Sequence, residues 1–268
     1  GAMLRAPVRE SPMRRLAAAA VALVLALAPA SAAVKKVAYP AVKVEMPAPF
    51  AGDAAFDAAR KAVADAVAKK DLAALAALVA PNFVATVGGE PGEQYDKTKD
   101  GLHNFKVAFG FRPFGKDADG DTDLGPQWEL IADFAAEKSF APGRDANTVC
   151  GPALPVPDAK AFERASALIE DPEQPAEWIY SMPEITLTAS PGGGAVVGKT
   201  AGTALPVLGT SPPLRPGGPP PVHLELLLPS GKSGWVTVAA VKPLVADQLC
   251  FAKQPGGDWK IAAYDQGE

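Results

Sequence analysis

The chain has 268 residues, of which 48% are hydrophobic and 21% charged, with a formal net charge of −4. This composition supports a buried core, so it excludes a wholly disordered chain, a collagen-like repeat and a disulfide-only miniprotein. The length allows two modest domains, and the 28 prolines and 25 glycines predict short elements joined by many turns.

The first 32 residues have the three parts of a secretory signal. Two arginines precede a 13-residue apolar run from Leu16 to Ala28, which is too short to cross about 30 Å of hydrocarbon. Ala30-Ser31-Ala32 then supplies the small-x-small pattern that a signal peptidase accepts. We therefore expect residues 1–32 to be a tag scar and a signal peptide, and the mature chain to be periplasmic or secreted, with no membrane span.

The mature chain is more acidic than the whole sequence. Residues 1–32 carry four Arg and one Glu, so residues 33–268 hold 22 basic and 29 acidic side chains, a formal net charge of −7. An acidic protein lacks the basic footprint that attracts phosphate backbones or anionic lipid. We expect no nucleic-acid partner.

Cys150 and Cys250 are the two cysteines of the chain. Export would place them in an oxidising compartment, where a pair favours a disulfide bond. That bond would close a loop of about 100 residues and stabilise the fold by about 4–5 kcal/mol in the chain-entropy model. Two buried free thiols are the alternative.

The segment after the signal predicts an extended lead-in followed by helices. Residues 33–52 contain three prolines among alternating Val and Lys, which suits an extended conformation. A helix is expected after the N-cap Asp53, because apolar residues then recur at spacings of three and four. Its apolar face is Phe56, Ala59, Val63 and Val67. Asp71 is expected to cap a second short helix, residues 83–87 have strand composition, and residues 127–136 predict a third helix.

Residues 101–114 hold a dense aromatic cluster for so aromatic-poor a chain. The cluster is His103, Phe105, Phe109, Phe111 and Phe114. We expect these side chains to form core, and an open pocket is the alternative.

Several ligand-binding patterns in the sequence are incomplete. The alternating acidic residues Asp117–Asp123 resemble calcium ligands, but the glycine and glutamate of a helix-loop-helix calcium site are missing at the expected positions. The segment is therefore either a weak calcium site or a solvated acidic loop. Gly193–Thr200 satisfies the P-loop pattern, yet the prolines that follow forbid the helix that a phosphate cradle requires. His103 and His223 have no neighbours at zinc-ligand spacing. We expect no metal, no cofactor and no catalytic residue.

The carboxy-terminal third resembles a bacterial Src-homology-3 domain. Ile185–Leu208 has the order of that family's opening strands and turns, and Val222–Leu226 with Leu228–Val236 resembles its central hairpin, in which a Ser-Gly-Lys turn precedes Gly-Trp-Val. The resemblance implies a small all-β barrel over residues 181–246. It also implies a partner-binding face that carries His223, Lys232 and Trp235.

The rest of the chain resembles, more loosely, exported proteobacterial proteins of unassigned activity that pair such a barrel with an α+β domain. Two helices around a Lys-Asp turn, a strand and a final Gly-Gly-Asp-Trp hairpin are similar to the cone-shaped nuclear-transport-factor-like (cystatin-like) fold. This similarity implies an α+β domain over residues 53–180.

The residues after Leu244 are left over once the barrel is complete. They predict a terminal hairpin within residues 247–268, and a two-stranded hairpin alone is marginally stable in water. We therefore predict that residues 247–265 pair into the sheet of the amino-terminal domain, so that the barrel is an insertion.

Two functional hypotheses follow from this organisation. The first is a non-catalytic, exported cell-envelope protein whose barrel binds a peptide segment of an envelope protein, or peptidoglycan. The alternative is a small-molecule-binding or enzymatic cone-fold domain with an accessory barrel. The discriminating feature is whether the aromatic cluster of residues 105–114 fills a core or lines a pocket.

Overall fold

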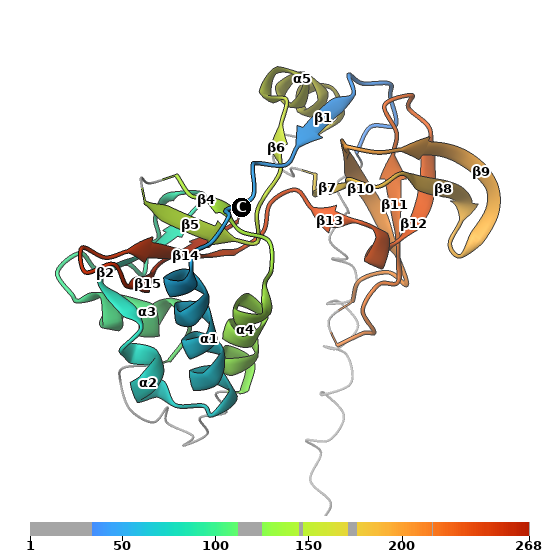
Figure 1. The fold of residues 1–268 in the computed structure, drawn as a ribbon. Helices are drawn as coiled ribbons and strands as arrows, with labels where there is room; N and C mark the ends of the chain where they lie inside the picture. Colours follow the sequence, from blue (N-terminus) through green and yellow to red (C-terminus); the bar gives the residue numbers. More distant parts are fainter. Residues whose placement is uncertain (1–33, 112–124, 145–146, 171–175, 216, 268) are drawn as a thin grey trace, which may run out of the picture.

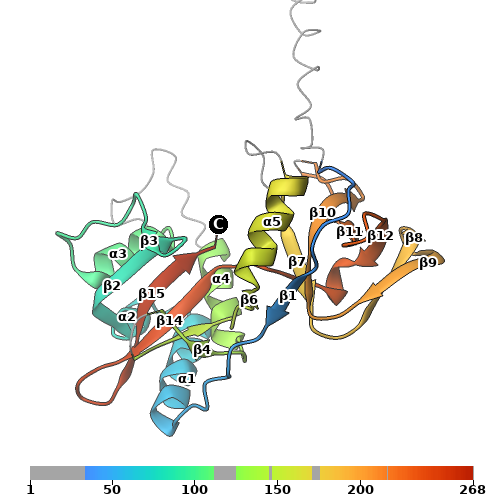
Figure 2. The ribbon, with the colours of Figure 1, turned by 90° about the horizontal axis from the view of Figure 1, so that it is seen from above.

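The computed structural model describes residues 34–111, 125–144, 147–170, 176–215 and 217–267. Within these ranges the protein is mixed α+β, with five α-helices and two largely antiparallel sheets of six and nine strands. Figures 1 and 2 show two lobes, each built on one of the sheets. The expected signal peptide, Phe114 and the acidic loop Asp117–Asp123 lie outside the described residues.

The first lobe is a six-stranded sheet packed with four helices. The strand order is β3-β2-β15-β14-β5-β4. The strands are β2 (Val79–Val87), β3 (Glu90–Pro91), β4 (Ala141–Pro142), β5 (Thr148–Gly151), β14 (Gln248–Lys253) and β15 (Trp259–Gln266). The helices are α1 (Ala54–Ala68), α2 (Leu72–Ala76), α3 (Gly101–Ala108) and α4 (Gly125–Ala136).

The terminal hairpin lies in the middle of this sheet, as the leftover length after Leu244 predicts. Strand β15 pairs with β2 in parallel, and β14 pairs with β5 in antiparallel. Almost 100 residues separate β5 from β14 in sequence, so the first lobe is built from two distant parts of the chain (Figure 1).

The described phenylalanines of the aromatic cluster are core, while His103 is half-buried. Phe105, Phe109 and Phe111 are 0%, 3% and 2% exposed and belong to the main hydrophobic cluster of the first lobe. Phe105 contacts Phe83 edge to face, with ring centroids 5.5 Å apart. These side chains therefore fill the lobe and do not line an open pocket.

The predicted disulfide bond is present and lies within the first sheet. Cys150 on β5 and Cys250 on β14 are directly opposite each other in the antiparallel pair, and their sulfur atoms lie 2.01 Å apart. Both residues are buried. The bond therefore joins the two parts of the chain that form the first sheet.

Asp53 ties the start of α1 to the terminal hairpin. Its Oδ1 accepts hydrogen bonds from the backbone N–H of Phe56 at 2.7 Å and from the indole N–H of Trp259 at 3.1 Å. Its Oδ2 accepts from the Lys253 ammonium at 2.8 Å. The Lys253 hydrogen bond, followed by the Phe56 N–H, holds the pKa of the Asp53 carboxyl below its usual value.

Replacing Asp53 by alanine is expected to lower the melting temperature by about 2–4 °C, because the helix loses its cap. Asp53→Asn keeps a capping oxygen and loses only the charge facing Lys253, so its melting temperature should fall by less than that of Asp53→Ala. A carboxyl whose pKa is lower in the folded state stabilises the fold at pH values above its unfolded pKa of about 3.9. That contribution is lost as the pH falls through the folded-state pKa. The difference in melting temperature between wild type and Asp53→Asn should therefore become smaller below about pH 4. Equal melting temperatures for all three proteins at pH 7 would contradict this role.

The second lobe is an open nine-stranded sheet. Its main order is β13-β7-β10-β11-β12-β8-β9, and β1 pairs with both β10 and β6. The strands are β1 (Val42–Glu45), β6 (Val156–Pro157), β7 (Trp178–Ser181), β8 (Ile185–Ser190), β9 (Gly193–Thr200), β10 (Thr203–Ser211), β11 (His223–Leu227), β12 (Ser233–Thr237) and β13 (Lys242–Pro243).

The closed barrel implied for residues 181–246 is not found in the described part of the chain. Closure would need the two ends of the order, β13 and β9, to meet. Instead the two-residue β13 pairs with Ile179 and Tyr180 of β7, and β9 pairs with β8 alone. Because Pro243 has no N–H to donate, β13 is also too short and too poor in donors to extend a ladder.

Segments from outside residues 181–246 complete the second lobe. Strand β1, within the expected lead-in, pairs with β10 through Val42 opposite Ala204, and β7 pairs with the same strand. Helix α5 (Ala159–Ile169) packs against β1 and shares its hydrophobic cluster. The range 53–180 therefore does not behave as one unit, because its last part packs on the second sheet and not on the first.

None of the helices in the described part of the chain combines the length and the apolar composition that crossing a membrane requires.

Candidate functional site

The candidate site lies on the outer face of strands β8, β11 and β12. Side chains of a strand alternate between its two faces. Strand β11 buries Leu224 and Leu226 in the lobe's core, so His223 and Glu225 project from the opposite face. The same alternation on β12 buries Val236 and leaves Trp235 on the outer face.

The strand register brings these outer residues side by side. His223 is opposite Thr237, and Glu225 is opposite Trp235. On its other side Trp235 is opposite Thr188 of β8. Facing residues of an antiparallel pair have Cβ atoms about 5 Å apart, so Glu225, Trp235 and Thr188 form one row across three strands.

A hollow of about 320 Å³ opens over this face. We call it the Trp235 hollow. It is lined by Ile185, Thr186, Thr188, Gly192, Gly193, His223, Trp235, Val236, Thr237 and Ala240. The turn between β8 and β9 forms one wall, because a Cβ atom at Gly192 would lie 3.9 Å from the His223 imidazole.

The lining combines an aromatic surface with neutral hydrogen-bonding groups. It contains three threonines, one histidine and one tryptophan, and no lysine, arginine, aspartate or glutamate. Trp235 and His223 are both half-buried. Neither the imidazole of His223 nor the indole N–H of Trp235 forms a hydrogen bond within the described ranges, so both can serve a ligand.

The third residue implied by the resemblance lies apart from the hollow. Lys232 is exposed in the turn between β11 and β12, where its backbone carbonyl accepts from the N–H of Leu228 at 2.8 Å. His223 is at the opposite end of that hairpin, and Lys232 is not among the lining residues. The structure thus brings His223 and Trp235 together and leaves Lys232 outside.

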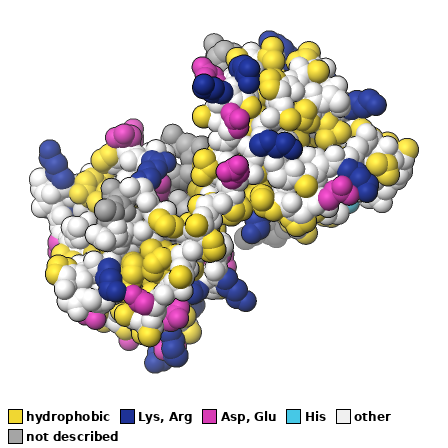
Figure 3. All heavy atoms as spheres, turned by 45° about the horizontal axis from the view of Figure 1, so that its top comes forward, with side chains coloured by type: hydrophobic (Ala, Val, Ile, Leu, Met, Phe, Trp, Pro, Cys, Tyr) yellow, Lys and Arg dark blue, Asp and Glu magenta, His cyan; other side chains and the backbone are white. Residues whose placement is uncertain are grey.

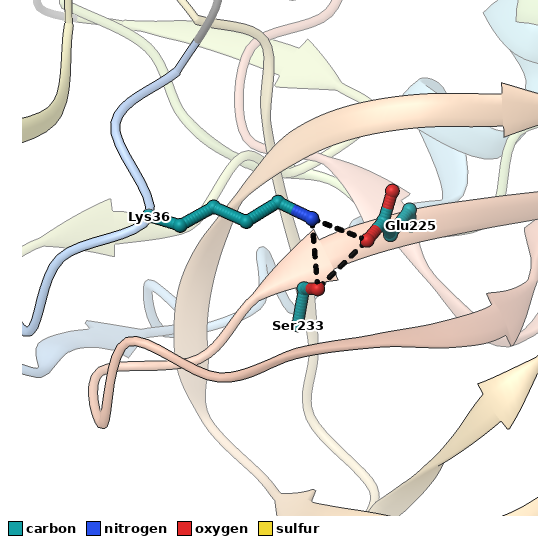
Figure 4. Close-up of polar contacts among 3 residues, drawn as sticks. All are labelled: Lys36, Glu225 and Ser233. Atoms are coloured by element: carbon teal, nitrogen blue, oxygen red, sulfur yellow. Dashed lines mark hydrogen bonds and ion pairs between the residues drawn. The ribbon is translucent and has the colours of Figure 1, made fainter.

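A polar cluster beside Trp235 has no counterpart in the sequence analysis. The Lys36 ammonium donates to Glu225 Oε1 at 2.9 Å and to Ser233 Oγ at 3.1 Å, and the Ser233 hydroxyl donates to the same Oε1 at 2.7 Å (Figure 4). Partial burial of Glu225 opposes its ionisation, but the hydrogen bonds from Lys36 and Ser233 outweigh it and lower the pKa of the carboxyl. No local pattern predicts this cluster, because 189 residues separate Lys36 from Glu225.

The remaining sequence patterns are structural in the described part of the chain. Gly193–Thr200 is strand β9, and strand β10 follows it, so the helix that a phosphate cradle needs is absent there. His103 lies on α3 of the first lobe, whereas His223 lies on β11 of the second lobe. No group of three or more His, Cys, Asp or Glu side chains suited to a metal ion occurs in these ranges.

Charge is mixed over one face of the molecule. On the face shown in Figure 3, side chains of both signs are interspersed over the two lobes. Recognition at such a surface depends on local contacts more than on long-range attraction.

No family model, curated protein or solved structure matches this chain.

Proposed function

We propose that this chain is an exported, non-catalytic binding protein of the bacterial cell envelope, and that the Trp235 hollow holds a saccharide unit of peptidoglycan. The observation that carries the proposal is the lining of the hollow. An indole, an imidazole and three threonine hydroxyls share one open surface on paired strands, and the lining contains no lysine, arginine, aspartate or glutamate.

The lining matches the chemistry of a sugar ring. A pyranose has an apolar C–H face and a rim of hydroxyl and amide groups. An indole offers a flat apolar body with one N–H donor, while threonine hydroxyls and an imidazole ring supply further hydrogen-bonding atoms. Ligand sites commonly combine such an apolar surface with a few polar groups. The lining contains no lysine, arginine, aspartate or glutamate, and the adjoining Glu225 is already paired with Lys36, which favours the glycan over a charged peptide.

The same lining supports binding more than catalysis. His223 is the one titratable side chain among the lining residues, and Glu225, two residues away on the same face of β11, is held by Lys36 and Ser233 with no hydrogen bond to His223. Acid–base and nucleophilic mechanisms need a partner group within hydrogen-bonding reach. The burial of Phe105, Phe109 and Phe111 in the core of the first lobe also favours the binding hypothesis over the cone-fold alternative.

Replacing Trp235 by alanine is expected to weaken retention on purified peptidoglycan by about tenfold or more, because truncating a central aromatic anchor typically has that effect. Co-sedimentation measures the retention, and titration with the tetrasaccharide of N-acetylglucosamine measures the affinity of the hollow. The matched control is Lys232→Ala, which changes the same hairpin outside the hollow and should bind as wild type does. Unchanged retention of a folded Trp235→Ala protein would move the function to the first lobe.

A further inference from the structure

The cluster of Lys36, Glu225 and Ser233 has the geometry of an ammonium-binding site. A primary ammonium has three N–H donors, and here two of them are directed to a carboxylate oxygen and a serine hydroxyl at 2.9 and 3.1 Å. The serine hydroxyl is itself oriented, because its hydrogen is donated to Glu225 at 2.7 Å. Its lone pairs are therefore left to accept from the ammonium.

This cluster adjoins the Trp235 hollow. Glu225 is opposite Trp235 in the strand pair and lies two residues from His223 on the same face of β11. Ser233 is likewise two residues from Trp235 on β12. Neither Glu225 nor Ser233 lines the hollow itself, but facing Cβ atoms are about 5 Å apart, which puts the Glu225 side chain beside Trp235 at the edge of the hollow.

Lys36 can leave this cluster without unfolding the segment that carries it. Its side chain is 53% exposed and that of Glu225 is 22% exposed, so the pair is of the exposed kind that contributes little to stability. The segment is held independently by Tyr39, which is 6% exposed. The Tyr39 hydroxyl donates to the Leu227 carbonyl at 2.7 Å, and its backbone N–H donates to the Pro229 carbonyl at 3.0 Å.

We propose that Glu225 and Ser233 form an ammonium subsite that extends the Trp235 hollow, and that Lys36 fills it when no ligand is bound. This inference rests on the proposed function and names the ligand class within it: a saccharide whose ring carries a primary ammonium, such as a hexosamine with a free amine. The ligand ammonium takes the place of the Lys36 ammonium on Glu225 and Ser233, while the ring stacks on Trp235.

The test compares two probes that differ only at nitrogen: the tetrasaccharide of glucosamine and the tetrasaccharide of N-acetylglucosamine. Lys36→Met removes the internal competitor, so affinity for the glucosamine probe should rise about two- to fivefold. Glu225→Gln removes the charged acceptor, so affinity for the same probe should fall about tenfold. Neither variant should change affinity for the acetylated probe by more than about twofold.

An ion pair elsewhere on the second lobe supplies the matched controls. Lys199 and Glu184 lie 2.9 Å apart with side chains 57% and 60% exposed. Lys199→Met and Glu184→Gln make the same changes in net charge without touching the subsite, and both should bind the two probes as wild type does.

The outcomes separate this inference from the proposed function. If Lys36→Met and Lys199→Met bind the glucosamine probe equally, the ammonium subsite is overturned. If the acetylated probe binds through Trp235 while Glu225→Gln leaves glucosamine binding unchanged, the subsite alone falls. Failure of wild type to bind either probe would overturn both proposals.

Discussion

A chain that ends at Leu244 is expected to lose the first lobe while keeping the second. The deletion removes β14 and β15, the two middle strands of the six-stranded sheet, and so separates β2 from β5. It also removes five core side chains: Leu249, Phe251, Trp259, Ile261 and Tyr264. Each contributes about 1.5–3 kcal/mol when buried, so their sum is comparable with the whole stability of a typical domain, about 5–15 kcal/mol.

Thermal unfolding followed by near-ultraviolet circular dichroism checks this expectation. That signal reports packed aromatic side chains, and the core of the first lobe is rich in them. A point substitution provides a graded version. Phe251 is 1% exposed and its ring packs edge to face on Phe56 with centroids 5.5 Å apart, so Phe251→Ala should cost about 3–5 kcal/mol. The control Val196→Ala, at a side chain 62% exposed on β9, should stay within about 0.5 kcal/mol. A truncated chain whose first lobe still melts cooperatively at the wild-type temperature would refute the arrangement.

Loss of the disulfide bond is expected to reduce the free energy of unfolding by about 4–5 kcal/mol, since the bond closes a loop of 100 residues. The double substitution of Cys150 and Cys250 by alanine tests this by chemical denaturation. The native fold should persist, because β5 and β14 remain paired through three further residues on each strand.

Reduction supplies the control for that experiment. Wild type with reductant should match the double variant, and reductant should not affect the double variant. Thiol counting under denaturing, non-reducing conditions should find no free thiol in protein recovered from an oxidising compartment. Two free thiols there would contradict the bond.

Local sequence signals predicted the elements that depend only on neighbouring residues, such as helix starts. Asp53 and Asp71 cap their helices as expected, because an aspartate side chain satisfies the N–H groups of the first turn wherever the rest of the chain lies. Two other helices were missed, although each has the same signal. Asp100 accepts from the His103 N–H and caps α3, and Asp158 accepts from the Ala161 N–H and caps α5. Aromatic crowding near α3 and the prolines before α5 obscured their helical periodicity.

Half of the candidate site could also be anticipated from sequence. The resemblance to a bacterial Src-homology-3 domain implied a face that carries His223, Lys232 and Trp235, and in the structure the alternation of β11 and β12 puts His223 and Trp235 on one face. The hollow itself depends on the β8–β9 turn that brings Gly192 against His223, and no short pattern specifies that approach.

The sequence by itself determined the starts of α1 and α2, the terminal hairpin and the cysteine pair, since each follows from neighbours in the chain or from counting. Only the tertiary structure decided that β1 pairs with β10, that the second sheet stays open, and that Lys36 reaches Glu225 across 189 residues. These contacts join segments with no shared local signature. Their formation depends on which strand edges and apolar faces remain available after the rest of the chain has packed.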